Sequence, residues 1–193
     1  MFICEKGLDI PTVEVDLMGK AQHEIEFQLK NPRCTVPMLE LDNGEFIWDT
    51  LTICDYLEAG YPNPPLMGSN PEQRARVLMW YQRIVEDGFM AVSESFRNYV
   101  QGFKGQSLTG PVGYEQIPAL VARGRARAQR FLEDLNSHLT GCEFIVDDIF
   151  TLADIAAIVT VDFAKAIKLE VADHQNDLKR WHHTISVRPS ARL

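Results

Sequence analysis

The sequence lacks the features that mark a membrane, a disulfide-bonded or a zinc-binding protein. No run approaches the roughly 20 apolar residues that a membrane-spanning helix needs, and we expect no signal peptide. Only 4 cysteines occur in 193 residues, and they are scattered, with no CxxC pair and no metal-ligand spacing. These absences predict a cytoplasmic protein that holds no metal and has no membrane partner.

Positive charge is also scarce. The chain has 19 Lys and Arg against 27 Asp and Glu, which gives a formal net charge of −8. Because nucleic acids bind to basic surfaces, this balance argues against a nucleic-acid partner. The one basic cluster lies at residues 123–130, in a helical pattern, and is interpreted as a solvated or subunit-bridging helix face. A hydrophobic content of 46% predicts a packed protein of one large or two small domains.

The first 62 residues mix strand and helix patterns. Alternating apolar residues predict a strand over residues 12–17. The Asn43-Gly44 dipeptide is typical of a tight turn and predicts a hairpin around it. The other expected elements are a helix end at residues 2–6, a short helix or turn at 22–30, hairpin strands at 38–41 and 46–48, and a helix at 50–60.

The rest of the chain has helical patterns throughout. Residues 62–71, rich in proline, are the clearest linker. Asn70 suits the N-cap of the long helix that follows, and Pro71 suits its first turn. Further helices are expected at residues 120–139, 152–167 and 174–187. Residues 152–167 are apolar on almost every side, which predicts a buried central helix.

The Val36-Pro37 step stands at the start of a predicted strand. It is compatible with a cis peptide bond, which about 5% of X-Pro bonds adopt. A cis bond would present the backbone N–H and C=O of Val36 to an extended peptide, which would pair with them as an added strand does. The alternative is an ordinary trans proline at a strand entry, and the dipeptide alone favours that alternative.

An acid and a hydroxyl, Asp49 and Thr50, open the helix predicted at residues 50–60. A helix N-terminus offers free N–H groups and a partial positive charge, both of which suit a carboxylate. The Thr50 hydroxyl would add a donor and Asp49 would face an ammonium group, so the pair fits an amino-acid head. The alternative is that Asp49 is a simple N-cap worth about 1 kcal/mol, and in isolation the pair favours that alternative.

Thr151 and Asp154 have the spacing of a capping box before the buried helix, with aspartate in place of the commoner glutamate. We interpret this pair as structural, because each side chain can satisfy a backbone donor that the helix leaves free. The five histidines show no ligand spacing, and we expect them to lie at the surface or to be partly packed.

Taken together, the motifs resemble the glutathione transferase family, in particular its bacterial cytosolic members. The order is NP-x-x-x-VP, L-x-L-D-x-G, an acid-hydroxyl pair, a helix ending in YLE, and a Pro-rich linker. The resemblance covers essentially the whole chain. It implies an α/β thioredoxin-like domain at residues 1–62, a linker at 63–72 and an all-α helical bundle at 73–193, in a homodimer.

The resemblance also implies roles for the residues, and it reverses the preferences stated for the two motifs in isolation. The backbone of Val36, before a cis Pro37, would pair with the cysteinyl unit of glutathione. Asp49 and Thr50 would hold its γ-glutamyl head. The glycine carboxylate would meet side chains drawn from Gln22, His23 and Thr35.

The implied reaction is attack of the glutathione thiolate on a small hydrophobic electrophile, or related glutathione-dependent chemistry. Phe89, Phe96 and Tyr99 are candidates to line the electrophile's pocket, with an ordinary place in the core as the alternative. The alternative function is a non-catalytic module of the same fold that binds glutathione or a protein.

One expected part is missing. Family members begin with a strand and then a loop that bears a Ser, Cys or Tyr, whereas this chain starts near the end of the helix that follows that loop. We therefore expect an incomplete thioredoxin-like domain whose catalytic residue lies upstream of Met1. The chain as given is expected to bind glutathione weakly and to turn over little.

Overall fold

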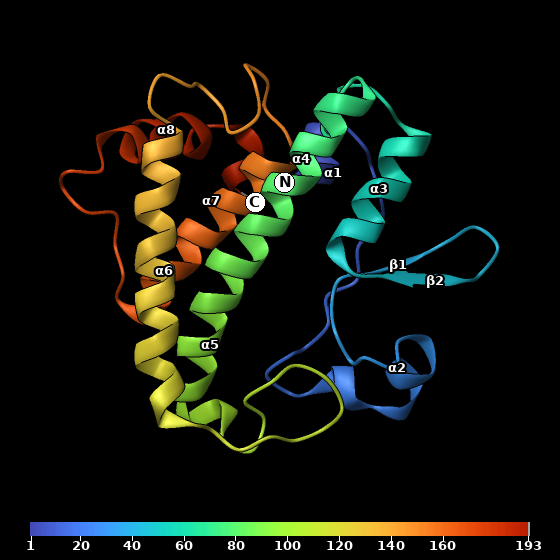
Figure 1. Cartoon of the computed structure of the whole chain (residues 1–193). Coiled ribbons are helices and arrows are strands. Elements are labelled where there is room, and N and C mark those ends of the chain that lie inside the picture. Colours follow the sequence, from blue (N-terminus) through green and yellow to red (C-terminus); the bar gives the residue numbers. More distant parts are fainter. Residues whose placement is uncertain (193) are drawn as a thin grey trace.

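A computed structural model describes residues 1–192, which form a small mixed α/β part and a larger helical part (Figure 1). The small part contains an antiparallel hairpin in which Met38 pairs with Trp48 and Glu40 pairs with Phe46. Its elements are α1 (Phe2–Glu5), the 3₁₀ turn η1 (Ala21–His23), α2 (Ile25–Lys30), β1 (Met38–Glu40), β2 (Phe46–Trp48) and α3 (Thr50–Gly60).

The hairpin turn follows the sequence prediction. Gly44 has a φ of +82°, a left-handed value that glycine adopts without steric cost. Its N–H donates to the Leu41 carbonyl at 2.8 Å, and Leu41 N–H donates to the Glu45 carbonyl at 2.8 Å. These bonds close a three-residue loop over residues 42–44, a common hairpin connection.

The strand predicted over residues 12–17 is wrong. These residues have no strand hydrogen bonds, and Val13 is 90% exposed. Asp16 and Leu17 instead accept turn bonds from the N–H groups of Ala21 and Lys20. Alternation produces a strand only where a neighbouring strand completes the backbone bonds, and within residues 1–192 no segment pairs with this one.

The helical part is built on one long rod, in which α4 (Pro71–Arg83), the π-helical turn η2 (Ile84–Phe89) and α5 (Met90–Tyr99) follow one another without a break (Figure 1). The remaining elements are η3 (Gln101–Phe103), α6 (Pro118–His138), α7 (Leu152–Ala164), η4 (Lys165–Ile167), α8 (Asn176–Ser186) and η5 (Pro189–Arg192). Among the described helices, none combines the length and apolarity that crossing a bilayer requires.

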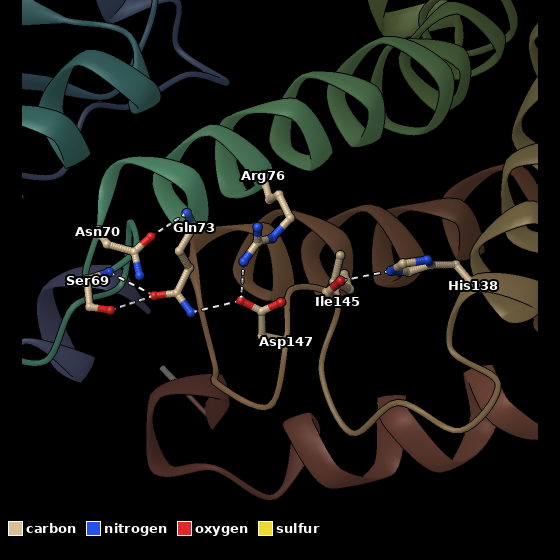
Figure 2. Close-up of polar contacts among 7 residues, drawn as sticks. All are labelled: Ser69, Asn70, Gln73, Arg76, His138, Ile145 and Asp147. Carbon is tan, nitrogen blue, oxygen red and sulfur yellow. Dashed lines mark hydrogen bonds and ion pairs between the residues drawn. The ribbon is translucent and has the colours of Figure 1, made fainter.

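The start of the rod follows the sequence prediction. The Asn70 side chain accepts a hydrogen bond from Gln73 N–H at 2.9 Å, and Pro71 opens the helix. Figure 2 shows how this end is tied to the loop before α7: Asp147 accepts from Gln73 Nε2 at 3.0 Å and from Arg76 Nη2 at 2.7 Å. The hydrogen bond from Arg76 holds the pKa of Asp147 below its usual range. These bonds hold the start of α4 against the loop before α7.

The core is centred on α7, which is buried along most of its length, as predicted. The rod crosses its neighbours at Gly88. A Cβ there would lie 2.7 Å from Phe131 Cε1 and 2.8 Å from Thr160 Cγ2, so only glycine lets η2 lie against α6 and α7.

The capping box at the start of α7 is present as predicted. One carboxylate oxygen of Asp154 accepts from Thr151 N–H at 3.0 Å and from the Thr151 hydroxyl at 3.2 Å. The other accepts from Ile145 N–H at 3.1 Å and from Trp181 Nε1 at 2.9 Å. Burial raises the pKa of Asp154, although all these donors oppose the rise. Asp154 therefore joins α7, the preceding loop and α8.

Helix α1 is docked on both parts of the molecule. Glu5 accepts from Arg188 Nη2 at 2.6 Å and also from the Ser190 hydroxyl. The ammonium of Lys6 is buried, pairs with Glu58 at 2.6 Å and donates to the carbonyl of Tyr61 at 2.7 Å. These contacts hold the first helix against the C-terminal end of α3 and against the chain's last turn.

Candidate functional site

The register of the hairpin brings the two predicted binding motifs together. Met38 pairs with Trp48, so the two residues before Met38 and the two after Trp48 leave the hairpin at the same end. Those residues are Val36-Pro37 and Asp49-Thr50. The segment that leads into β1 therefore lies beside the N-terminus of α3, at the base of that helix in Figure 1.

The Val36-Pro37 peptide bond is cis. Val36 is 41% exposed, and no hydrogen bond from the described residues reaches its backbone N–H or C=O. In a folded chain most backbone groups are paired, so an exposed, unpaired N–H and C=O on one residue form a free edge. That edge can pair with an extended peptide.

The turn before Val36 is organised by Asn31, whose side chain is buried. Asn31 Nδ2 donates to the Thr35 carbonyl at 2.7 Å, and Asn31 Oδ1 accepts from Arg33 N–H at 3.0 Å. Cys34 N–H donates to the Asn31 carbonyl at 3.0 Å. Residues 31–35 are thus fixed by one asparagine, a role that the sequence did not reveal because the NP-x-x-x-VP motif indicates no partner for the Asn31 side chain.

Asp49 is not a simple N-cap. It stands at the N-cap of α3, yet its side chain makes no capping hydrogen bond and is exposed. Its backbone has a φ of +70° and a ψ of 131°, a conformation that costs a non-glycine residue on the order of 1–3 kcal/mol. A strained aspartate with a free carboxylate at this place supports a ligand-binding role and removes the capping alternative.

Thr50 is the first residue of α3 and is exposed. Its hydroxyl makes no hydrogen bond with another described residue, and the first N–H groups of the helix have no intrahelical partners. The positive end of the α3 dipole adds to the attraction for an anion. Thr50 and the helix mouth can therefore hold a carboxylate while Asp49 faces a neighbouring ammonium.

The three candidates for the glycine carboxylate, Gln22, His23 and Thr35, are not brought to the end of the hairpin by its register. Gln22 and His23 lie in η1, and α2, which follows, lies across the hairpin from α3 in Figure 1. Gln22 Oε1 is buried without a hydrogen-bond partner among the described residues. Thr35 takes hydrogen bonds from Asn31 at its carbonyl and, at 3.3 Å, at its hydroxyl, so it helps to shape the turn. Their binding roles stay predictions.

Aromatic side chains gather along α5 and α7. Phe163 lies 5.4 Å from Phe89 and 5.4 Å from Phe96, centroid to centroid, and Phe96 lies 5.5 Å from Phe103. Tyr99 is 62% exposed. The sequence pointed to Phe89, Phe96 and Tyr99. Phe103 and Phe163 were missed because they lie on other segments, which only the fold brings to this cluster.

Two of the four cysteines, Cys34 and Cys54, are buried in the described chain. Cys54 is buried in α3, and burial raises the pKa of its thiol to about 12, which disfavours the reactive thiolate. Cys34 is also buried, with its sulfur 3.8 Å from the Pro32 carbonyl oxygen. Within residues 1–192, no three His, Cys, Asp or Glu side chains are grouped as metal ligands would be.

Two domain models match the chain. The N-terminal domain of glutathione S-transferase matches residues 1–65, and the C-terminal domain of glutathione S-transferase matches residues 79–189. The chain belongs to the glutathione S-transferase family. The resemblance read from the motifs is thereby confirmed at the level of the family.

Individual relatives agree with this assignment. Glutathione S-transferase 2 of Saccharomyces cerevisiae is 28% identical over 193 residues, which cover 98% of this chain and 80% of the relative. The maleylacetoacetate isomerase of Rattus norvegicus is 28% identical over 171 residues, 88% of this chain and 73% of the relative. A glutathione S-transferase domain-containing protein of Marinobacter aquaeolei has a similar crystal structure, with a TM-score of 0.89, 33% identity, and coverage of 98% of this chain and 91% of that one. The predicted fold, a thioredoxin-like part followed by a helical part, is confirmed.

Proposed function

We propose that the chain binds reduced glutathione through Val36, Asp49 and Thr50 and is a transferase that joins the glutathione sulfur to small hydrophobic electrophiles. The observation that carries the proposal is the open Asp49 carboxylate at the mouth of α3, beside the unpaired backbone edge of Val36. The membership in the glutathione S-transferase family supports it.

In this proposal different groups of the chain bind the two charges of the γ-glutamyl head. Its carboxylate accepts from the first N–H groups of α3 and from the Thr50 hydroxyl. Its ammonium faces Asp49. The cysteinyl unit pairs with the N–H and C=O of Val36 as an added strand does, which fixes the direction of the peptide. Gln22, His23 and Thr35 are the proposed contacts of the glycine carboxylate.

The proposed reaction is a nucleophilic substitution. The thiol proton leaves to solvent, and the resulting thiolate attacks an electrophilic carbon to form a carbon–sulfur bond. The leaving group departs with the electron pair of the bond that breaks. The partly exposed aromatic cluster of Phe89, Phe96 and Phe163 supports an apolar second substrate. The proposal assigns the anchors of glutathione and assigns no catalytic side chain.

We further propose a homodimer in the cytoplasm. Membership in the family supports the dimer, and four cysteines that form no disulfide in the described chain support the cytoplasmic location. Light scattering coupled to gel filtration tests the first point, with an expected mass of about twice the 21.9 kDa of one chain. A mass of one chain at micromolar concentration would contradict it.

The function is tested by two measurements on the purified chain. Equilibrium dialysis with radiolabelled glutathione is expected to show saturable binding, because the anchors of the γ-glutamyl head are present. A spectrophotometric assay with 1-chloro-2,4-dinitrobenzene is expected to show thioether formation only slightly above the uncatalysed rate, in keeping with the little turnover predicted from the sequence. Binding without turnover would support the non-catalytic module. The absence of binding at millimolar glutathione would contradict both functions.

A second candidate is glutathione-dependent isomerisation. It is favoured by the similarity to the rat maleylacetoacetate isomerase. In such a reaction the thiolate would add to a conjugated double bond and leave again after rotation, so glutathione is regenerated. Incubation with maleylacetoacetate distinguishes the two, because isomerisation consumes no glutathione and conjugation consumes one equivalent.

A further inference from the structure

The connection between α5 and α6 is long and rich in glycine, yet it is internally hydrogen-bonded. We call residues 100–117 the strap. Ser107 is buried, its N–H donates to the Tyr114 carbonyl at 2.9 Å, and its hydroxyl donates to the Glu115 carbonyl at 2.9 Å. Gly105 has a φ of +73°, and a Cβ at Gly113 would lie 2.7 Å from the Gly105 carbonyl oxygen. The strap is therefore a folded unit.

One side chain of α5 anchors this unit. Arg97 donates to three strap carbonyls: Nε to Ser107 at 3.1 Å, and Nη2 to Gln106 at 2.7 Å and to Leu108 at 2.8 Å. Its guanidinium also lies 4.3 Å from the centroid of the Phe103 ring. No other residue type supplies several donors from one rigid plane at this place, so a lysine could satisfy only part of this set.

The strap reaches the small part of the molecule at its tip. A Cβ at Gly110 would lie 3.7 Å from the carbonyl oxygen of Arg33, which is ordinary van der Waals contact. Figure 1 shows the strap extending from the lower end of α5 toward the segment around η1 and α2. Arg33 belongs to the Asn31 turn and stands three residues before Val36. The backbone at the tip thus comes within the reach of one added methyl group of the turn that presents the free edge.

We propose that Arg97 is a positioning residue that holds the strap against the Arg33 turn and so keeps the backbone edge of Val36 in place for a peptide ligand. This inference rests on the proposed function only for the identity of that ligand, glutathione. The chain of contacts runs from Arg97 to the carbonyls at residues 106–108, through the strap to Gly110, and from there to Arg33. The helical part therefore supports the binding edge of the other part.

Hydrogen–deuterium exchange of the full chain without ligand tests the mechanical link. In Arg97→Met the strap amides lose their protection, and we expect the hydrogen-bonded amides of Arg33 and Cys34 to exchange at least about fivefold faster, with no change in α7. Arg97→Lys should give a smaller effect of the same kind. Gly110→Val should loosen the amides of Arg33 and Cys34 too, since it adds bulk at the contact and strains a φ of +116°.

One glycine variant is a matched control. Gly102→Ala adds a methyl in the same strap where nothing lies within 4 Å, and its exchange pattern should equal that of the wild type. If Arg97→Met frees the strap amides and leaves the amides of Arg33 and Cys34 unchanged, the inference is overturned.

A glutathione titration followed by NMR separates this inference from the proposed function. The expected result is a Kd raised about three- to tenfold in Arg97→Met and unchanged in Gly102→Ala. An unchanged Kd in Arg97→Met overturns the role in ligand binding. If the wild type binds no glutathione, the proposed function fails. The exchange experiment then decides the inference alone, with faster exchange at Arg33 and Cys34 supporting it and unchanged exchange overturning it.

Discussion

Two aspartates at two helix starts have opposite surroundings. Asp154, in the first turn of α7, is fully buried, and its two oxygens accept four hydrogen bonds from the chain itself. Asp49, at the N-cap of α3, is exposed, has a strained backbone and makes no capping bond. Each has a threonine close by in the sequence: Thr50 directly follows Asp49, and Thr151 stands three residues before Asp154.

The difference is the one expected between a structural acid, Asp154, and the proposed binding acid, Asp49. A carboxylate whose lone pairs are all used within the fold stabilises that fold, and removing it leaves buried donors without partners. A carboxylate that makes no hydrogen bond within the fold leaves its oxygens free to accept from a ligand. Where its backbone is also strained, that strain lowers the stability of the fold. Stability should therefore depend on Asp154, and glutathione affinity on Asp49.

The largest effect is expected for Asp154→Ala. Three donors from residues 145, 151 and 181 would lose a buried partner, as would the Thr151 hydroxyl, and we expect a loss of about 4 kcal/mol or more. For a chain of this length that lowers the Tm by about 8–16 °C, measurable by circular dichroism. The Tm of Asp154→Asn, which keeps one acceptor oxygen, should lie between the Tm of the wild type and that of Asp154→Ala. A stable Asp154→Ala variant that has lost glutathione binding would break the comparison.

The converse variant is Asp49→Ala. It should weaken glutathione binding by about 10- to 100-fold, because the ammonium of the ligand loses its charged partner. The Tm should stay within about 2 °C of the wild type, since no capping bond is lost. Asp49→Gly should bind as weakly and be more stable than Asp49→Ala, because glycine accepts the φ of +70°. A marked loss of stability in Asp49→Gly would show that Asp49 is structural after all.

Glu5 extends the comparison to a second structural acid. The hydrogen bond from Arg188 lowers the pKa of Glu5 from its ordinary 4.5, so the folded state favours the charged form. Its contribution is complete above the unfolded pKa and is lost as pH falls through the lower folded pKa. Glu5→Gln should thus lower the Tm at pH 7 by about 4–8 °C, for a loss of about 2 kcal/mol. The difference should shrink toward pH 3. A difference that stays constant with pH would show that charge is not its origin.

The smallest effect is expected for Thr50→Ala. Loss of one hydroxyl donor to the ligand carboxylate should raise the Kd for glutathione about three- to tenfold, which corresponds to about 1 kcal/mol. Thr50→Ser keeps the donor and serves as the control. Isothermal titration of both variants tests the point, and equal affinities of the alanine and serine variants would remove Thr50 from the site.

Much of the fold follows from local signals. The bounds predicted for α3, the hairpin turn at Gly44 and the cap at Asn70 agree with the structure because each depends on residues next to one another. The strand predicted at residues 12–17 is wrong because it depends on a partner strand that local alternation does not reveal. The π-helical turn was missed because it arises where Gly88 packs on α6 and α7.

The candidate site was predicted in part. The order of motifs pointed to Val36, Asp49 and Thr50, and the hairpin register brings them to one end. The strain at Asp49 was not visible, since an acid before a helix usually caps it. The role proposed for Arg97 was not visible in the sequence either. Arg97 occupies an ordinary helical position and acquires its hydrogen-bond partners only when the strap folds back on α5.

The most direct test compares glutathione with its isomer in which the glutamyl unit is joined through the α-carboxyl group. In NMR titrations of the chain, the account predicts that the γ-linked peptide shifts the amides of Val36 and of the first turn of α3. It also predicts that this peptide binds at least about tenfold more tightly than the isomer and that Asp49→Ala abolishes the preference. Equal affinity of the two peptides, or unchanged chemical shifts of these amides, would contradict the assignment of Asp49 and Val36 as residues that bind glutathione.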